Sequence, residues 1–136
     1  MKRLAKVFAA LCAVYWLLLA HVSLNFLDDS SGSTRTSRDG KFRVVINEMY
    51  PVNPIGLYCF LTTELSPIYF SLYEKRLGYI GQSSPFFCYR KWSDAELLYP
   101  DEADGSFVVV DMENNGELDI STKDKRWWSW WFGIFH

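Results

Sequence analysis

The strongest pattern along the chain is a long apolar run after a basic start. Three basic residues lie within the first six positions, and residues 7–27 then carry no Asp, Glu, Lys or Arg before Asp28 and Asp29 close the run. A helix over residues 7–27 spans ~30 Å, which matches the hydrocarbon core of a bilayer. The pattern predicts an export signal or a transmembrane anchor over residues 1–27.

The flanks of this run favour an uncleaved anchor. Signal cleavage requires small side chains at the cut, but a cut after Ala20 places Leu18 at the third position before it, and a cut after Ser23 places His21 there. Basic residues stay on the cytoplasmic side, and here they precede the run. We therefore expect a single-pass protein of the bacterial inner membrane, with a cytoplasmic N-terminus and a periplasmic C-terminal domain.

The polar stretch and the alternation that follow predict a linker and then strands. Residues 28–37 are rich in Ser, Gly and Thr, which is typical of a linker. Apolar and polar residues alternate over 41–49, as in a strand with one buried face. Residues 57–65 fit a short helix or a strand, and residues 92–98 fit a helical turn. Further strands are predicted at residues 68–73, 79–82, 86–89, 107–111 and 118–121.

These elements predict a mainly β fold behind the N-terminal helix. Residues 38–124 would form a small periplasmic domain with an antiparallel sheet of about five to seven strands. The alternatives for its shape are a sandwich, an open barrel or a curled sheet. Residues 125–136 form a separate, Trp-rich C-terminal segment.

Charge and cysteine content limit the partners and the compartment of this domain. Three of the 14 basic residues lie in the leader, so 11 basic and 16 acidic residues remain, and their net charge is −5. Nucleic-acid binding needs a basic face, so we expect no nucleic-acid partner. In an exported domain, Cys59 and Cys88 favour a disulfide over two buried thiols.

Candidate catalytic and metal-binding groups are sparse. The two histidines lie in the leader and at the C-terminus, so the body has no histidine base for a serine or cysteine nucleophile. Residues 111–122 resemble a calcium loop, but Thr122 occupies the position of its bidentate acid, and a hairpin explains the same residues. We expect no enzyme activity, no catalytic or metal site and no cofactor.

The stretch from residue 94 to residue 124 is strongly acidic, with Lys123 as its single base. Such a surface steers a basic partner, although a solvated face that keeps the domain soluble explains it equally well. Aromatic residues amid charge are typical of interface hot spots, and also of a core. The candidate partner-binding residues are Trp92, Asp94, Glu96, Tyr99, Asp101, Glu102 and Asp104.

The C-terminal segment has three competing interpretations. It is a strand or helix packed on the sheet, an interfacial segment on a membrane, or an anchor for a partner. Trp rings prefer the headgroup layer and nearby cations meet lipid phosphates, while the segment is too short to span a bilayer. The candidate membrane-interface residues are Lys125, Arg126, Trp127, Trp128, Trp130 and Trp131.

Several segments also carry a resemblance that covers most of the chain. They are the basic leader with Tyr15-Trp16, and residues 37–42, 78–85 and 125–128. Together they resemble small, singly anchored periplasmic bacterial proteins of a family of unknown function. Proteins of this build include immunity proteins against envelope-acting toxins, such as type VI secretion effectors and bacteriocins.

By this analogy of build, we expect a non-enzymatic, membrane-anchored binding protein that blocks a basic protein toxin. Its acidic residues would steer the toxin's basic cleft toward Trp92 or Tyr99, which would fill it. The alternative is a structural or accessory envelope protein that docks to a membrane complex through the anchor and the Trp-rich segment.

Overall fold

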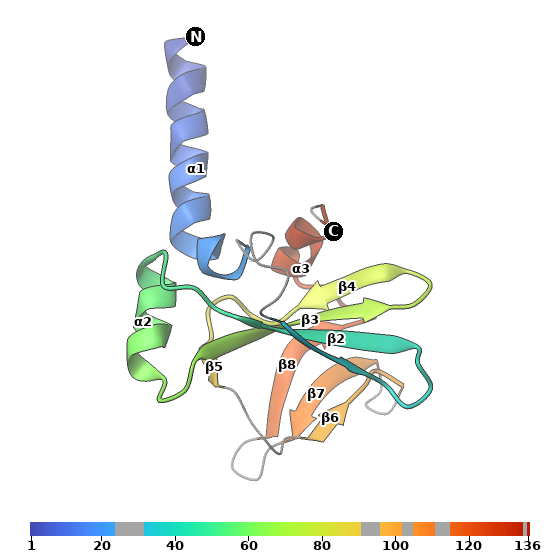
Figure 1. The fold of residues 1–136 in the computed structure, drawn as a ribbon. Helices are drawn as coiled ribbons and strands as arrows, with labels where there is room; N and C mark the ends of the chain where they lie inside the picture. The colour runs from blue at the N-terminus through green and yellow to red at the C-terminus, as the bar shows by residue number, and fades with distance from the viewer. Residues whose placement is uncertain (24–31, 91–95, 102–104, 111–114, 135) are drawn as a thin grey trace.

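A long N-terminal helix projects from a small β domain, as Figure 1 shows. The computed structural model describes residues 1–23, 32–90, 96–101, 105–110, 115–134 and 136. In chain order the elements are α1 (Lys2–Ser23), β1 (Ser33–Thr36), β2 (Phe42–Glu48), α2 (Pro54–Thr62), β3 (Pro67–Glu74), β4 (Gly78–Gln82), β5 (Tyr89–Arg90), β6 (Glu96–Leu98), β7 (Ser106–Val110), β8 (Asn115–Ser121) and α3 (Trp127–Phe132).

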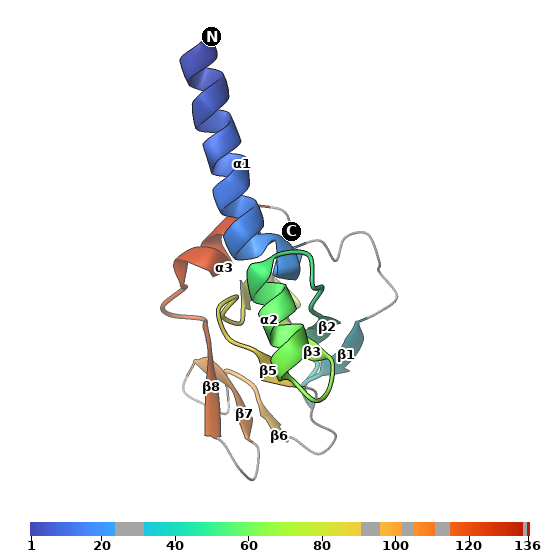
Figure 2. The ribbon, with the colours of Figure 1, turned by 90° about the vertical axis from the view of Figure 1, so that its left-hand side faces the viewer.

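The predicted N-terminal apolar helix is confirmed. Within α1, the stretch Lys2–Val22 has the length and composition of a helix that crosses a membrane. The helix ends at Ser23, and residues 24–27, which the sequence pattern included, lie outside the described part of the chain. Figure 2 shows α1 standing clear of the domain along most of its length.

The strands form two open antiparallel sheets, which confirms the predicted mainly β fold. One is 5-stranded, with the order β1-β2-β3-β4 and with β5 also pairing with β3; the other is 3-stranded, with the order β6-β7-β8. The register pairs Val44 with Leu72 in the first sheet and Phe107 with Ile120 in the second. The two sheets remain open and pack face to face, so the domain is not a closed barrel.

The main core lies between the two sheets. Its residues point inward because side chains alternate along a strand: Phe42 and Val44 are buried, whereas Arg43 between them is exposed. From the second sheet, Phe107 meets Phe70 with their ring centroids 6.2 Å apart. The buried members of this core are Phe42, Val44, Ile68, Phe70, Leu72, Ile80, Tyr89, Tyr99, Phe107, Val109 and Ile120.

Strand β3 is buried on both faces and separates two hydrophobic clusters. Ile68, Phe70 and Leu72 face the main core, while Tyr69, between them, belongs to a second cluster. This second cluster joins α1, α2 and α3 to the opposite face of the first sheet. The sheet thus carries its partner sheet on one side and the helices on the other (Figures 1 and 2).

Three expectations from the sequence are corrected or decided here. Residues 33–36, assigned to the linker, form edge strand β1; its four side chains are exposed, so no hydrophobic alternation marked it. Residues 57–65 resolve in favour of a helix, because α2 covers Pro54–Thr62. The helical turn expected at 92–98 is wrong where it is described, because Glu96–Leu98 pairs with β7 as β6.

Candidate functional site

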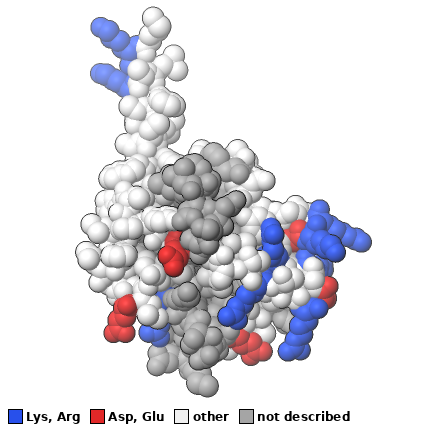
Figure 3. Space-filling model, in the orientation of Figure 1, with Lys and Arg blue, Asp and Glu red and all other residues white. Residues whose placement is uncertain are grey.

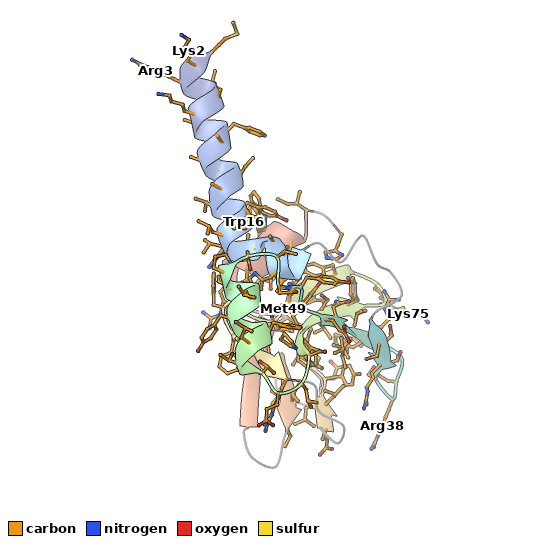
Figure 4. The ribbon with its side chains drawn as sticks, turned by 60° about the vertical axis from the view of Figure 1, so that its left-hand side comes forward. Lys2, Arg3, Trp16, Arg38, Met49 and Lys75 are labelled. Carbon is orange, nitrogen blue, oxygen red and sulfur yellow. A yellow bond between two sulfur atoms is a disulfide. The ribbon has the colours of Figure 1, made fainter. Side chains whose placement is uncertain are left out.

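The end of α1 is built into the domain. Leu19, Ala20, His21 and Val22 are all buried, although the helix above them is largely exposed. Figure 4 places Met49 directly beneath the base of α1. Apolar burial of this kind fixes the orientation of the helix on the domain, because moving it would return these side chains to water.

Asn53 connects α1 to α2. Its Oδ1 accepts a hydrogen bond from the backbone N–H of Gly56 at 2.8 Å, which caps the N-terminus of α2, and Pro54 opens the helix. One hydrogen of its Nδ2 is shared between the carbonyls of Trp16 and Leu17, at 2.8 and 3.0 Å. One buried side chain therefore begins α2 and holds it against the last exposed turn of α1.

His21 completes this joint. Because Oδ1 of Asn53 is already an acceptor, its Nδ2 donates to Nδ1 of His21, at 2.9 Å. That tautomer leaves a hydrogen on Nε2 of His21, which donates to the carbonyl of Pro85 at 2.6 Å. Both ring nitrogens are occupied in these contacts, so the imidazole serves as a structural bridge.

The second hydrophobic cluster surrounds this joint. Leu19 and Val22 of α1 pack with Met49 and with Trp128 and Phe132 of α3. Gln82, buried at the end of β4, donates from Nε2 to the carbonyl of Val22 at 3.3 Å. The C-terminal end of α1 and helix α3 therefore meet in one cluster.

The structure contains the disulfide predicted between Cys59 and Cys88. Their sulfur atoms lie 2.06 Å apart, and the bond joins α2 to the segment that leads into β5. Cys59 is fully buried, and the remaining cysteine, Cys12, is a free thiol exposed on α1.

Helix α3 presents one face to the domain and the other to the outside. Nε1 of Trp128 and Oγ of Ser129 donate to the carbonyl of Gln82, at 3.0 and 3.2 Å, and the backbone N–H of Gln82 donates to Oγ of Ser129 at 2.9 Å. Trp128 is buried, so its assignment to a membrane interface is wrong. The indole of Trp128 lies in the second cluster because its N–H finds a backbone acceptor there.

The opposite face of α3 keeps the other candidates for a membrane interface. Trp127, Trp130 and Trp131 are exposed, and so is Ile134 one turn further on. Lys125 and Arg126, just before the helix, are exposed as well. The segment therefore packs on the domain through one face, as the first interpretation expects. Its other face presents aromatic side chains outward, and the membrane and partner interpretations of that face stay predictions.

The candidate partner-binding residues divide into three groups. Glu96 on β6 and Asp101 are exposed. Asp101 forms an ion pair with Lys41, with Oδ1 and Nζ 3.1 Å apart. Tyr99 is buried against Phe42, with ring centroids 6.4 Å apart, so the assignment of Tyr99 to a partner surface is wrong. The candidates outside the described residues are Trp92, Asp94, Glu102 and Asp104.

A basic face also lies around the hairpin ends, which the sequence pattern did not single out. Figure 3 shows Lys and Arg gathered on one side of the domain, and Figure 4 places Arg38 and Lys75 on the side away from α2. Strand pairing brings these residues together from separate turns, so no local run of charge signals them. The exposed members are Arg35, Arg38, Lys41, Arg43, Lys75 and Arg76.

In the part of the chain that the structure describes, no group of three His, Cys, Asp or Glu side chains is placed to hold a metal ion. His136 stacks on Tyr79, with ring centroids 4.5 Å apart, and its Nδ1 lies 3.1 Å from the hydroxyl of Tyr73. Burial lowers the pKa of His136 and raises the pKa of Tyr79 and Tyr73. Both tyrosines are already neutral near pH 7 at their ordinary pKa of about 10, and burial favours the neutral form of His136 as well.

The residues that sequence reasoning missed are those of the joint. Asn53 followed by Pro54 is the signal of a helix N-cap with proline at the first helical position, and it precedes an apolar stretch. The burial of His21 has no comparable signal, because its partner carbonyl at Pro85 is 64 residues away.

Comparison with known proteins gives a family and nothing more specific. No curated protein matches the chain. No solved structure matches it. The sequence profile described as "Family of unknown function (DUF6201)" matches residues 1–132, nearly the whole chain, including α1 and α3. The protein therefore belongs to the DUF6201 family.

Proposed function

We propose that this protein is a non-enzymatic binding module, held at the bacterial inner membrane by α1, with its β domain in the periplasm. The observation that carries the proposal is the burial of the end of α1 in the domain, which makes anchor and domain one unit. The basic residues at the free end of α1 (Figure 3) favour a cytoplasmic N-terminus. The Cys59–Cys88 disulfide suits an oxidising compartment.

The partner that we propose is a basic, envelope-acting protein toxin, which the domain would neutralise by occlusion. The part of the chain after the leader carries a net charge of −5, and such a charge attracts a basic partner. Glu96 lies on the sheet β6-β7-β8, at the end of the molecule opposite the free end of α1 (Figure 1). A toxin that approaches from the periplasm would meet this sheet first.

Two measurements test the proposal. Alkaline phosphatase fused after His136 is active in the periplasm, and an inactive fusion contradicts the topology. A host without the gene should become sensitive to a toxin encoded beside it, and the full chain should restore protection. Unchanged sensitivity contradicts the immunity role.

Charge variants extend the second measurement. Glu96→Lys should weaken protection, because it reverses a charge on the proposed contact surface. Glu64→Lys is the matched control, because Glu64 is also an exposed glutamate but lies just beyond the end of α2. This variant should protect like the parent. Equal protection by both variants contradicts a contact through β6.

A second candidate function rests on α2, whose outward side chains are large and apolar. An accessory envelope protein would use such a surface to dock to an integral membrane complex. Purification from mild detergent distinguishes the two functions: a stable integral partner supports the accessory role, and a soluble secreted partner supports immunity.

A further inference from the structure

The free apolar length of α1 is short compared with a bilayer. The domain buries the helix from Leu19 onward, so its free apolar part runs from Val7 to Leu18, which spans ~18 Å. Measured from Lys2, with the aliphatic parts of the basic side chains included, it spans ~25 Å. A hydrocarbon core is ~30 Å thick, so ~5–12 Å of apolar surface has to come from the domain itself.

Helix α2 offers apolar surface at the required place. It begins beside the last exposed turn of α1, because Asn53 binds the carbonyls of Trp16 and Leu17. It then runs away from α1 for ~13 Å, as Figures 1 and 2 show. Its buried residues are Gly56 and Cys59, and the large side chains that remain exposed on it and just beyond are Leu57, Tyr58, Phe60, Leu61 and Leu65.

Helix α3 adds an aromatic surface at the base of α1. Trp130, which is 68% exposed, lies on the outward face with Trp127 and Trp131. Phe86, also exposed, meets the ring of Trp127 with centroids 6.1 Å apart, and so extends this surface onto the domain. Indole rings favour the headgroup layer, and Lys125 beside them suits lipid phosphates.

We propose that the domain is seated in the membrane interface, with the outward face of α2 and the exposed tryptophans of α3 in contact with lipid. The inference rests on the proposed anchoring by α1 and deepens it. Lipid accounts for the outward faces of α2 and α3, because both faces continue the apolar surface of α1 from its base. They supply the apolar length that α1 lacks to span the hydrocarbon core. The seat also holds the sheet β6-β7-β8 away from the bilayer (Figure 2).

Site-directed spin labels test this seat in the full chain, reconstituted in vesicles of phosphatidylethanolamine and phosphatidylglycerol. Leu61→Cys and Trp130→Cys report on α2 and α3 in a Cys12→Ser background that keeps the disulfide. Leu77→Cys is the matched control: Leu77 is 78% exposed and Leu61 74%, but Leu77 lies in the turn between β3 and β4. Leu11→Cys reports on the anchor itself.

The readout is the collision rate of each label with oxygen, which concentrates in lipid, and with a water-soluble nickel complex. We expect the oxygen-to-nickel ratio at positions 61 and 130 to exceed that at position 77 several-fold. If the oxygen-to-nickel ratios at positions 61 and 130 equal that at 77 while the ratio at 11 is high, the contact of the domain with lipid is contradicted and the anchoring by α1 is not. A ratio at position 11 as low as that at 77 contradicts both the anchoring by α1 and the contact of the domain with lipid. A label at position 61 that collides rarely with both oxygen and the nickel complex also contradicts the contact with lipid, because a protein partner or a second copy then covers α2.

Discussion

Asn53→Ala should weaken the joint between α1 and α2 and so destabilise the fold. Asn53 is buried, and its amide caps α2 while it binds both the backbone of α1 and the ring of His21. Alanine removes all of these contacts and adds no clash, because it is smaller than asparagine. The joint therefore offers a clean single substitution.

The magnitude follows from which partners are left alone. Loss of an asparagine N-cap costs about 1 kcal/mol. Nδ1 of His21 becomes a buried acceptor without a donor, which costs about 1–3 kcal/mol. The carbonyls of Trp16 and Leu17 add little, because each remains available to the helical hydrogen bonds of α1. We expect a decrease of about 2–4 kcal/mol in the free energy of unfolding.

Urea unfolding of the full chain in mild detergent measures this change, with near-ultraviolet circular dichroism as the probe of aromatic packing. Thr62→Ala is the control: it removes an exposed hydroxyl that binds the carbonyl of Tyr58 at the other end of α2, and should cost less than about 0.5 kcal/mol. Asn53→Asp keeps the capping oxygen but replaces the donor with a charge, so it should destabilise at least as much as alanine. If Asn53→Asp behaves like the parent, the cap alone matters and the joint does not.

Three further outcomes are expected. Reduction of the disulfide should lower the free energy of unfolding by about 3–4 kcal/mol in the chain-entropy model, and equal urea midpoints with and without reductant would contradict this. Gly56→Ala should destabilise by about 1–3 kcal/mol despite alanine's better helix propensity, because its methyl would overlap the carbonyl oxygen of Tyr50; a stability gain in the same unfolding assay would refute it. The hydroxyl of Ser37 donates to Asp39 at 2.5 Å and lowers the pKa of that carboxyl, so this contact stabilises the fold above the ordinary carboxyl pKa and is lost as the pH falls through the lowered value. Ser37→Ala should raise the pKa of Asp39 in a carboxyl NMR titration, and an unchanged pKa would disprove the assignment.

The elements that sequence reasoning identified correctly are those with a strong local pattern. The apolar run of α1 and the alternation in β2 each dictate a structure over a few turns or a few residues. Edge strand β1 carries Ser, Thr and Arg and is held by backbone pairing with β2, so its sequence looks like a linker. Its strand state depends on β2, and no local pattern encodes that.

The candidate site was less predictable, because apolar residues look alike whether they face lipid, a partner or a core. Leu19 and Val22 continue the pattern of the exposed helix above them, yet they are buried. Tyr99 has the composition of a hot spot, yet Phe42 from a distant strand covers it. The division of the C-terminal segment into a buried and an exposed face was easier to predict, once a helix is assumed. Trp128 and Phe132 lie four residues apart and share one helical face, whereas Trp130 lies on the other.

The meeting of the base of α1 with α3 in the second cluster sets an order for assembly. On the proposed topology, α1 enters the membrane before the domain is exported, so its last turn does not yet have its neighbours from the domain. Leu19 and Val22 gain their full set of neighbours in this cluster only when Trp128 and Phe132, which come far later in the chain, are in place. A chain without α3 would therefore leave the buried end of α1 partly uncovered, so α3 belongs to the contact that fixes α1 on the domain.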